Sequence, residues 1–272
     1  MTDTNLKVRD HYSPTNLTAR IKSLLATIVP DDQILTVTQL AALDQFHSRG
    51  ILATSELGEA AELTPLTRVL DIGCGIGGPA RYLAATFGSH VVGVDLSASF
   101  VETADYLTAR CGLSERVAFQ VGDAMHLPFE DAAFDAAFLQ HVAMNVEDRP
   151  ALYREVSRIL PAGGRFVVYD LILQNGDVVY PVPWARTPET SFLLTEEETR
   201  KALIQAGFKI DLWRDDTQVA LQWFKAATAA PPQSGLNLGV VMGSEFQSMT
   251  GNLARNLREG SLGVLSAVLI RE

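Results

Sequence analysis

The spacing of apolar residues predicts helices at the start of the chain, followed by a regular alternation of strands and helices. Apolar side chains recur at helical spacing from Leu17 to Ile28, and Pro30 is expected to end that helix. Two further helical stretches are expected over residues 40–46 and 52–61. The chain is therefore expected to open with a group of helices that precedes the first strand.

Short apolar runs then alternate with amphipathic stretches over most of the chain. Ser99 and Glu102 are expected to form the capping box of one helix, and Pro150 and Pro161 are expected to bound another. Because strands that alternate with helices pair in parallel through right-handed crossovers, the pattern predicts a doubly wound α/β sheet. The runs expected to form strands are residues 68–72, 90–94, 117–121, 134–139, 165–173, 208–214 and 262–270.

Two segments interrupt this alternation. Residues 174–194 are rich in proline and aromatic side chains, and we interpret them either as a substrate lid or as an ordinary packed insertion. A capping box that starts at Thr195 opens the helix that follows them. Residues 216–260 hold apolar side chains at helical spacing from Met242 to Leu257. The alternatives for that stretch are a helix packed on the domain, a binding groove and a homodimer surface.

The composition indicates a folded globular protein. Apolar residues make up 47% of the 272 residues and charged residues 20%, which leaves enough apolar surface to form a core. Acidic residues outnumber basic ones by 32 to 22, so the formal charge is −10. Because such a surface repels phosphate backbones and anionic lipids, nucleic acid is not an expected partner.

The two cysteines further limit the chemistry and the location. They are too few for a disulfide framework or for an iron–sulfur cluster held by four cysteines, which argues against a radical enzyme. The sequence holds no signal peptide and no apolar run of the roughly 18 residues that a membrane span requires. We therefore expect a cytoplasmic protein with no membrane span and no bound metal.

A glycine-rich loop lies between the first expected strand and the helix after it, and reads Gly73-Cys74-Gly75-Ile76-Gly77-Gly78. Glycines there let the backbone turn sharply and approach a ligand at the carboxyl end of a strand, where open α/β sheets bind ligands. The same loop also satisfies the dinucleotide-binding pattern, so a nicotinamide-dependent oxidoreductase is one alternative. We interpret Cys74 as a small packing residue rather than a nucleophile, since no base is fixed near it in sequence.

Three aspartates at successive strand ends favour a different cofactor. Asp71 precedes the loop, where a carboxylate can accept hydrogen bonds from an ammonium group but would be repelled by a pyrophosphate; its alternative role is that of a turn former. Asp95 ends the second strand and can accept both ribose hydroxyls. Asp123 ends the third and can accept from an adenine amino group. An ammonium, a ribose and an adenine without phosphate together describe S-adenosylmethionine.

Four stretches carry a resemblance to a known family: VLDIGCGIGGPARYLA, VVGVDLS, GDAMHLPFEDAAFD and EVSRILPAGGRFVVYD. They resemble the class I S-adenosylmethionine-dependent methyltransferases. They are most similar to the branch of sterol, tocopherol, phosphoethanolamine and ubiquinone-biosynthesis methyltransferases. The resemblance is strong over residues 66–173, extends to about residue 214, and includes LDQFHSRG at 43–50 more weakly.

The resemblance implies a Rossmann-like, seven-stranded, mostly parallel sheet with helices on both faces and an antiparallel last strand. Residues 1–65 would form an N-terminal helical cap. Residues 66–272 would form the methyltransferase domain, with insertions at 174–194 and 216–260. The cofactor residues implied by position are Gly73, Gly75 and Gly77 at the methionine end, Asp95 and Leu96 at the ribose, Asp123, Ala124 and Met125 around the adenine, and Gln140 near the sulfonium. Leu96 and Met125 have a simple core role as their alternative.

Methyl transfer from a sulfonium is an in-line displacement that needs alignment and, for some acceptors, removal of a proton. His141 is the candidate general base, and the alternative is a histidine that fixes the backbone or the cofactor. His47 is interpreted as a contact of the site or as a histidine on a helix surface. The candidate substrate contacts from the first insertion are Tyr180, Trp184 and Phe192.

The sequence therefore predicts an enzyme that transfers a methyl group from S-adenosyl-L-methionine to a nitrogen, oxygen or carbon of a small molecule. The product of the cofactor would be S-adenosyl-L-homocysteine. The alternatives are a non-catalytic S-adenosylmethionine-binding module and, less favoured by the three aspartates, the nicotinamide-dependent oxidoreductase.

Overall fold

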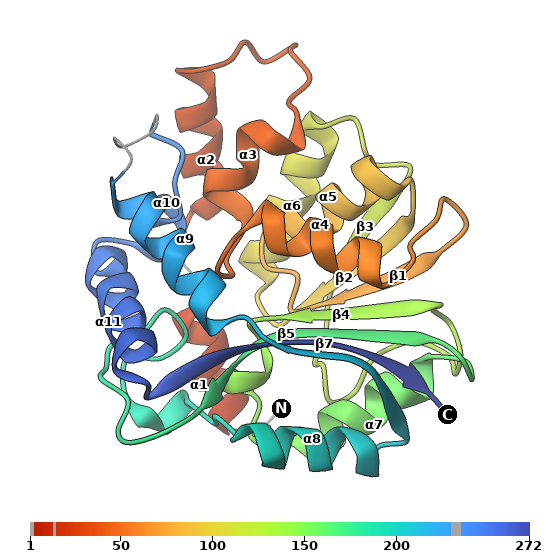
Figure 1. Cartoon of the computed structure of the whole chain (residues 1–272). Helices are drawn as coiled ribbons and strands as arrows, with labels where there is room; N and C mark the ends of the chain where they lie inside the picture. The colour runs from red at the N-terminus through yellow and green to blue at the C-terminus, as the bar shows by residue number, and fades with distance from the viewer. Residues whose placement is uncertain (1–2, 13–14, 230–234) are drawn as a thin grey trace.

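The computed structural model describes residues 3–12, 15–229 and 235–272. Seven strands form one sheet in the order β3-β2-β1-β4-β5-β7-β6 (Figure 1). Strands β1 to β5 pair in parallel, and β7 runs antiparallel to both β5 and β6. The predicted seven-stranded sheet with an antiparallel last strand is therefore confirmed. The strands are β1 (Arg68–Ile72), β2 (His90–Asp95), β3 (Val117–Val121), β4 (Ala136–Gln140), β5 (Arg165–Leu173), β6 (Phe208–Asp215) and β7 (Leu262–Arg271).

Helices cover both faces of this sheet. Figure 1 shows α4, α5 and α6 on one side and α7 and α8 on the other. Within the first group, α3 and α4 pack on α5, and α2 packs on α6. The α-helices are α1 (Asp3–His11), α2 (Leu17–Ala26), α3 (Val37–Asp44), α4 (Ile51–Ala60), α5 (Gly78–Phe87), α6 (Ala98–Arg110), α7 (Arg149–Ile159), α8 (Glu196–Gln205), α9 (Thr217–Ala229), α10 (Gly239–Met242) and α11 (Phe246–Glu259). Two short 3₁₀ helices are η1 (Ala143–Asn145) and η2 (Pro188–Thr190).

The core divides into two layers because successive side chains of a strand point to opposite faces. Val69 of β1 and Phe138 of β4 pack toward α4 and α5. Leu70 and Leu139 pack toward α7 and α8. Strands buried on both faces read as continuous apolar runs, which explains why the parallel strands are visible in the sequence.

The ends of the helices were predicted less accurately than the strands. The capping box at Thr195 is present, and its hydroxyl accepts from the Glu198 N–H at 3.2 Å. The box expected from Ser99 and Glu102 was wrong. Helix α6 begins at Ala98, so Ser99 already lies inside it, and the residue that caps α6 is Ser97.

Two further expectations need correction. Helix α2 ends at Ala26, before Pro30, because a turn separates the helix from the proline. The apolar stripe that starts at Met242 is divided between α10 and α11, which begins at Phe246 after a turn at Gly243 with φ +85°. Helices α1 and α9 were not predicted.

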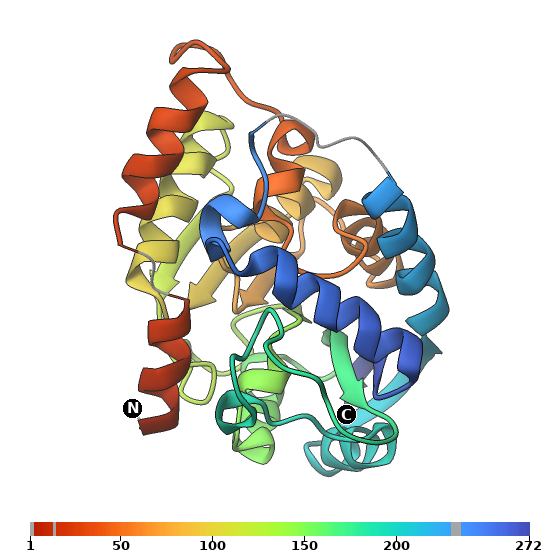
Figure 2. The same ribbon diagram turned by 90° about the vertical axis from the view of Figure 1, so that its left-hand side faces the viewer.

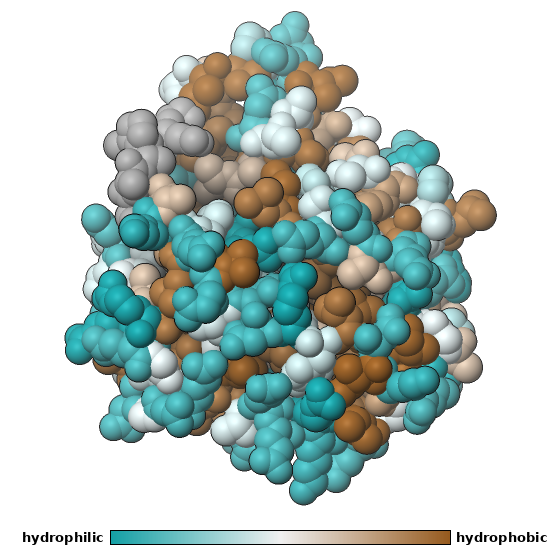
Figure 3. Space-filling model, in the orientation of Figure 1, coloured by the Kyte–Doolittle hydropathy of each residue, from teal (hydrophilic) through white to brown (hydrophobic). Residues whose placement is uncertain are grey.

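Helices α1, α10 and α11 lie together at one side of the molecule. Figure 2 looks onto that side, with α1 in red and α10 and α11 in blue. A third apolar cluster joins the N-terminal helices to this region, with Leu17, Ile21 and Leu40 packed beside Leu236 and Val241. Figure 3 shows polar and apolar residues interspersed over the face seen in Figure 1. Among the described residues, no helix has the length and apolar character needed to cross a bilayer.

Candidate active site

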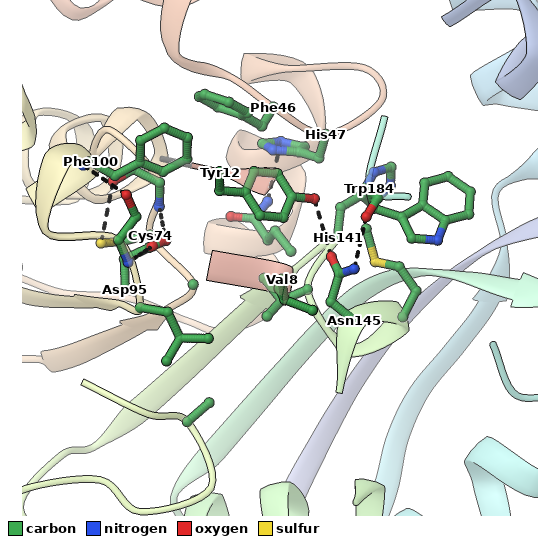
Figure 4. A pocket seen from close by; sticks show the side chains of 18 of the residues that line it. Val8, Tyr12, Phe46, His47, Cys74, Asp95, Phe100, His141, Asn145 and Trp184 are labelled. Carbon is green, nitrogen blue, oxygen red and sulfur yellow. Dashed lines mark hydrogen bonds between the residues drawn. The ribbon is translucent and has the colours of Figure 1, made fainter. Parts of the chain in front are cut away.

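A cavity opens at the carboxyl ends of β1 to β4. Its atom-free space measures about 1340 Å³ with the open mouth included. Its walls come from α1, the loop before α4, the glycine loop, the segment after β4, the first insertion and the α10–α11 region. Figure 4 shows side chains from these separate segments pointing toward one another.

The glycine loop needs glycine at the positions nearest the cavity. Gly73 has φ +69°, and a Cβ there would lie 2.4 Å from a methyl of Val142. Gly75 has φ +55°, and its N–H donates to the Asp95 Oδ2 at 3.0 Å. Both residues line the cavity. The loop therefore approaches the cavity as bare backbone.

Gly77 is an exception among the predicted cofactor residues, since it is absent from the cavity lining. It caps α5 with φ +81°, and a Cβ there would lie 2.5 Å from the ring of Phe119. The residue allows the loop to pack against β3 rather than facing a ligand. Gly78 plays a comparable role toward α3, because a Cβ there would lie 2.1 Å from the backbone oxygen of Asp44.

Asp71, Asp95 and Asp123 all line this one cavity. Asp71 is 2% exposed, and its Oδ2 has no hydrogen-bond partner among the described residues. Burial, and then the charge of Asp95, raise the pKa of Asp71 to about 7. A buried carboxylate oxygen with no donor is costly unless a ligand supplies one.

Asp95 and Asp123 are positioned by backbone N–H groups. Asp95 accepts from Gly75 and, at 2.8 Å, from the Ser97 N–H; burial raises its pKa to about 6. Asp123 accepts from the Met125 N–H at 3.0 Å and from the Asn5 side chain of α1 at 2.8 Å. The neighbours Leu96, Ala124 and Met125 line the cavity as well.

Gln140 and His47 meet at the end of β4. The Gln140 Nε2 lies 3.3 Å from the Thr54 hydroxyl and 3.3 Å from the His47 Nε2, and its Oε1 has no partner among the described residues. His47 is 4% exposed and lines the cavity, so the alternative of a histidine on a helix surface is wrong. Burial lowers the pKa of His47 to about 4, so its ring is neutral near pH 7.

His141 has an unusual backbone conformation at the cavity wall. Its φ is +54°, and its N–H donates to the Tyr169 carbonyl at 2.7 Å. Strained positions of this kind concentrate at functional sites. Its ring stacks on Tyr169 at 5.4 Å between centroids, and the Ser48 hydroxyl lies 3.3 Å from its Nε2 and 3.0 Å from the Tyr169 hydroxyl. Burial, and then His47, hold the pKa of His141 well below its usual range.

Of the three substrate candidates in the first insertion, Trp184 lines the cavity. Tyr180 packs against the apolar cluster around β5 and β7 instead. Phe192 acts through its backbone: its N–H donates to the Met144 carbonyl at 2.7 Å and its carbonyl accepts from Arg149 at 2.9 Å. Neither side chain is part of the cavity wall.

Asn145 and helix α1 were missed by the sequence reasoning as parts of the site. The Asn145 amide donates to the Trp184 and Thr190 carbonyls, each at 2.9 Å, and its oxygen accepts from the Tyr12 hydroxyl at 3.1 Å (Figure 4). Asn5 and Val8 of α1, and Tyr12 just after its end, line the cavity. The signal for Asn145 was its position just after β4, whereas α1 is too polar to show a clear apolar stripe.

The segment after β4 is held by buried charged groups. Asp170 of β5 is 4% exposed and accepts from the Ala143 N–H at 2.6 Å. Arg149 is 6% exposed and donates to the Ala143 carbonyl at 2.6 Å. Asp170 therefore fixes the wall of the cavity and is not among the described residues that line it.

Comparison with known families agrees with this geometry. Residues 70–168 match a family model described as a methyltransferase domain. This part of the chain is a methyltransferase domain. Methyltransferase GfsG from Streptomyces halstedii is 34% identical to the chain over 135 residues, which cover 50% of this chain and 49% of that protein. Proteins named as sterol and tocopherol methyltransferases also match over the domain, which confirms the predicted family.

The matched region covers only part of the length of those relatives. The chain spans about half the length, or less, of the curated relatives it matches. Among solved structures, geranyl diphosphate methyltransferase in complex with geranyl diphosphate and sinefungin has a TM-score of 0.73 at 19% identity, with 100% of each chain covered. The [4+2]-cyclase SpnF has a TM-score of 0.67 at 23% identity, with 95% of this chain and 97% of that chain covered. These likenesses show that the methyltransferase domain has the Rossmann-like fold of those structures.

Proposed function

We propose that this protein binds S-adenosyl-L-methionine in the cavity and transfers its methyl group to a small-molecule acceptor, leaving S-adenosyl-L-homocysteine. The observation that carries the proposal is that Asp71, Asp95 and Asp123 line one cavity from the tips of three adjacent strands. In that order they suit an ammonium group, a ribose and an adenine amino group. The Asp71 Oδ2, which has no partner within residues 3–12, 15–229 and 235–272, and the bare backbone at Gly73 and Gly75 fit such a ligand.

The chain's own residues would align the reaction and keep water out. When bound, the cofactor supplies a methyl group already activated by its positive sulfur. Gln140 and the glycine loop would hold the reacting end, and the buried wall around Asn145 and Trp184 would exclude water. Orientation of this kind contributes roughly 7–11 kcal/mol in favourable cases. His141, neutral because its pKa is lowered, would accept a proton from an acceptor that must lose one.

The acceptor is inferred to be neutral and mainly apolar. Arg9 is the one arginine or lysine among the described lining residues, and it is paired with Asp10 at 3.0 Å. Recognition of a phosphorylated acceptor normally uses more than one cation. The apolar residues that line the cavity away from the three aspartates are Val8, Phe46, Val142, Met144, Val146, Trp184, Leu238, Met242, Phe246 and Leu253.

Two measurements test the proposed function. Thermal unfolding should show stabilisation by S-adenosylhomocysteine and not by NADH; the reverse result would favour the oxidoreductase. Incubation with S-adenosylmethionine that carries a radiolabelled methyl group, together with a panel of neutral apolar metabolites, should label one class of acceptor. Tight binding without any labelling would favour the non-catalytic module.

The affinity for S-adenosylhomocysteine is expected to fall as the pH is lowered through 7. An ammonium group binds the ionised form of Asp71, whose pKa in the free protein is about 7 because of burial and Asp95. Below that pKa the carboxyl must first lose a proton, which costs up to about tenfold in affinity per pH unit. Calorimetric titration from pH 5.5 to 8 checks this, and an unchanged dissociation constant would contradict it.

Replacing His141 with alanine is expected to lower turnover more than cofactor affinity. The base and its contacts with Ser48 and Tyr169 would be lost, while the three aspartates stay in place. Loss of general-base catalysis typically costs about 10²–10⁴ in rate. Single-turnover rates and S-adenosylhomocysteine titration of the same variant separate the two effects. An unaltered rate would leave His141 only the alternative role of fixing the backbone or the cofactor.

The other expectations from the sequence remain proposals. The acidic surface supports the prediction that nucleic acid is not a partner, since the formal charge is −10. The two buried free cysteines are compatible with the proposed cytoplasmic location. A homodimer also remains a prediction, which sedimentation of the purified chain would test.

A further inference from the structure

A fourth carboxylate lines the cavity and belongs to the N-terminal helices rather than to the sheet. Asp44 is the last residue of α3, and its side chain is 2% exposed. One of its oxygens, Oδ2, accepts from the Arg81 Nη2 at 2.8 Å. The other, Oδ1, has no hydrogen-bond partner among the described residues. Asp44 therefore presents one unused anionic oxygen at the edge of the cavity.

Asp44 and Asp71 both contact the first turn of α5, Asp44 at Gly78 and Asp71 at Ala80. The carboxyl carbon of Asp44 lies 2.8 Å from where a Cβ of Gly78 would be, and Asp71 accepts from the Ala80 N–H. Each carboxylate has one oxygen engaged by the protein and one without a partner in the part of the chain that the structure describes. Two such oxygens from different parts of the chain define a small anionic corner beside the glycine loop.

The anionic corner holds more negative charge than positive charge. Asp44 and Asp71 are buried there and Asp95 is half-buried, and the Arg81 guanidinium acts on Asp44 and Asp71. Other donors of Arg81 are directed to the Ile76 and Ala104 carbonyls and the Thr108 hydroxyl, and its Nε has no hydrogen-bond partner among the described residues. Burial accordingly raises the pKa of Asp44 to about 6 even though Arg81 is beside it. Buried anions without partners are costly, so a cationic group of a ligand would relieve this corner.

We propose that Asp44, together with Asp71, receives the ammonium group of the cofactor's amino-acid tail. An ammonium has three N–H donors, which can serve both free oxygens at once. This inference rests on the proposed function and extends it, because it makes the last residue of α3 a cofactor-binding residue. The N-terminal helices then bind the cofactor directly instead of only covering it.

Calorimetry with two ligands tests this assignment. S-adenosylhomocysteine carries the amino-acid tail, whereas 5′-methylthioadenosine has the same nucleoside and sulfur without it. Asp44→Asn keeps the size of the side chain and removes its charge. We expect it to weaken S-adenosylhomocysteine binding about tenfold or more, as for a lost charge-assisted hydrogen bond, and to leave methylthioadenosine unchanged. Asp95→Asn is the control variant, and it should weaken both ligands because the ribose is common to them.

Two outcomes would overturn the proposal: an unchanged affinity of Asp44→Asn for S-adenosylhomocysteine, or an equal loss for both ligands. An equal loss would mean that Asp44 acts only through the position of the loop. If Asp44→Asn does not fold, the double variant Asp44→Ala/Arg81→Met removes the whole ion pair, and proteins often tolerate that change at a buried pair. The ratio of its affinities for S-adenosylhomocysteine and methylthioadenosine then tests the proposal in the same way. Failure of the wild-type protein to bind either ligand would instead refute the proposed function.

Discussion

Asp95→Ala is expected to weaken S-adenosylhomocysteine binding by about one to two orders of magnitude. The side chain offers two acceptors at the tip of β2, and hydrogen bonds to a charged group contribute roughly 1.5–3 kcal/mol. The substitution also leaves the N–H groups of Gly75 and Ser97 without their present acceptor, so the glycine loop itself becomes less well held. Calorimetric titration of the purified variant measures the loss.

Glu102→Ala is the matched control for Asp95→Ala. Glu102 is exposed on α6 and away from the cavity lining, so its removal changes the net charge by the same amount without touching the site. Its affinity should equal that of the wild-type protein. If the wild-type protein, Asp95→Ala and Glu102→Ala all bind S-adenosylhomocysteine with equal affinity, Asp95 is not part of the cofactor site. An equal loss of affinity in both variants would point to a general effect of charge.

Gly78→Ala is expected to be among the most destabilising single-methyl changes in this chain. A Cβ at Gly78 would lie 2.1 Å from the backbone oxygen of Asp44, and a backbone atom cannot rotate away as a side chain can. Overpacking typically costs about 1–3 kcal/mol, and we expect the upper end or beyond, with displacement of α3 from α5. Denaturant unfolding of the variant measures the change in the free energy of unfolding.

Gly251→Ala is a control for which the expected change in the free energy of unfolding has the opposite sign. Gly251 is exposed within α11, and no atom that a Cβ of Gly251 would meet lies within 4 Å among the residues that the structure describes. Replacing an exposed helical glycine with alanine should stabilise the fold by about 0.5–1 kcal/mol. A Gly78→Ala variant as stable as the wild-type protein would show that α3 and α5 are not in close contact at Gly78.

The parts of the fold that the sequence predicted are those fixed by burial on two faces. Strand β5 has the bounds expected from its apolar run, because every residue from Phe166 to Ile172 is buried. The cap of α6 was predicted wrongly because two serines, Ser97 and Ser99, lie close together, and the choice between them depends on the turn made by Asp95. Helix α1 was not predicted because its place depends on contacts with residues far along the chain, such as that between Asn5 and Asp123.

The residues of the candidate site also divide into those that the sequence pattern could predict and those that depend on contacts between distant parts of the chain. Aspartates at the tips of parallel strands must meet at one edge of the sheet, so the pattern alone was enough to bring Asp71 and Asp123 together. The insertion offered no such geometric rule, and aromatic content alone could not separate Trp184, which lines the cavity, from Tyr180, which does not. Asp44 was hidden for a related reason: α3 had to be docked on α5 before its carboxylate could be seen beside the glycine loop.

The position of Trp184 also has a practical consequence. The sequence holds three tryptophans, all within the described residues, and Trp184 is the one that lines the cavity. With Trp213 and Trp223 replaced by phenylalanine, the emission of the remaining indole would come from the cavity wall alone. The arrival and departure of unlabelled ligands could then be followed in real time by stopped-flow fluorescence, before any acceptor has been identified.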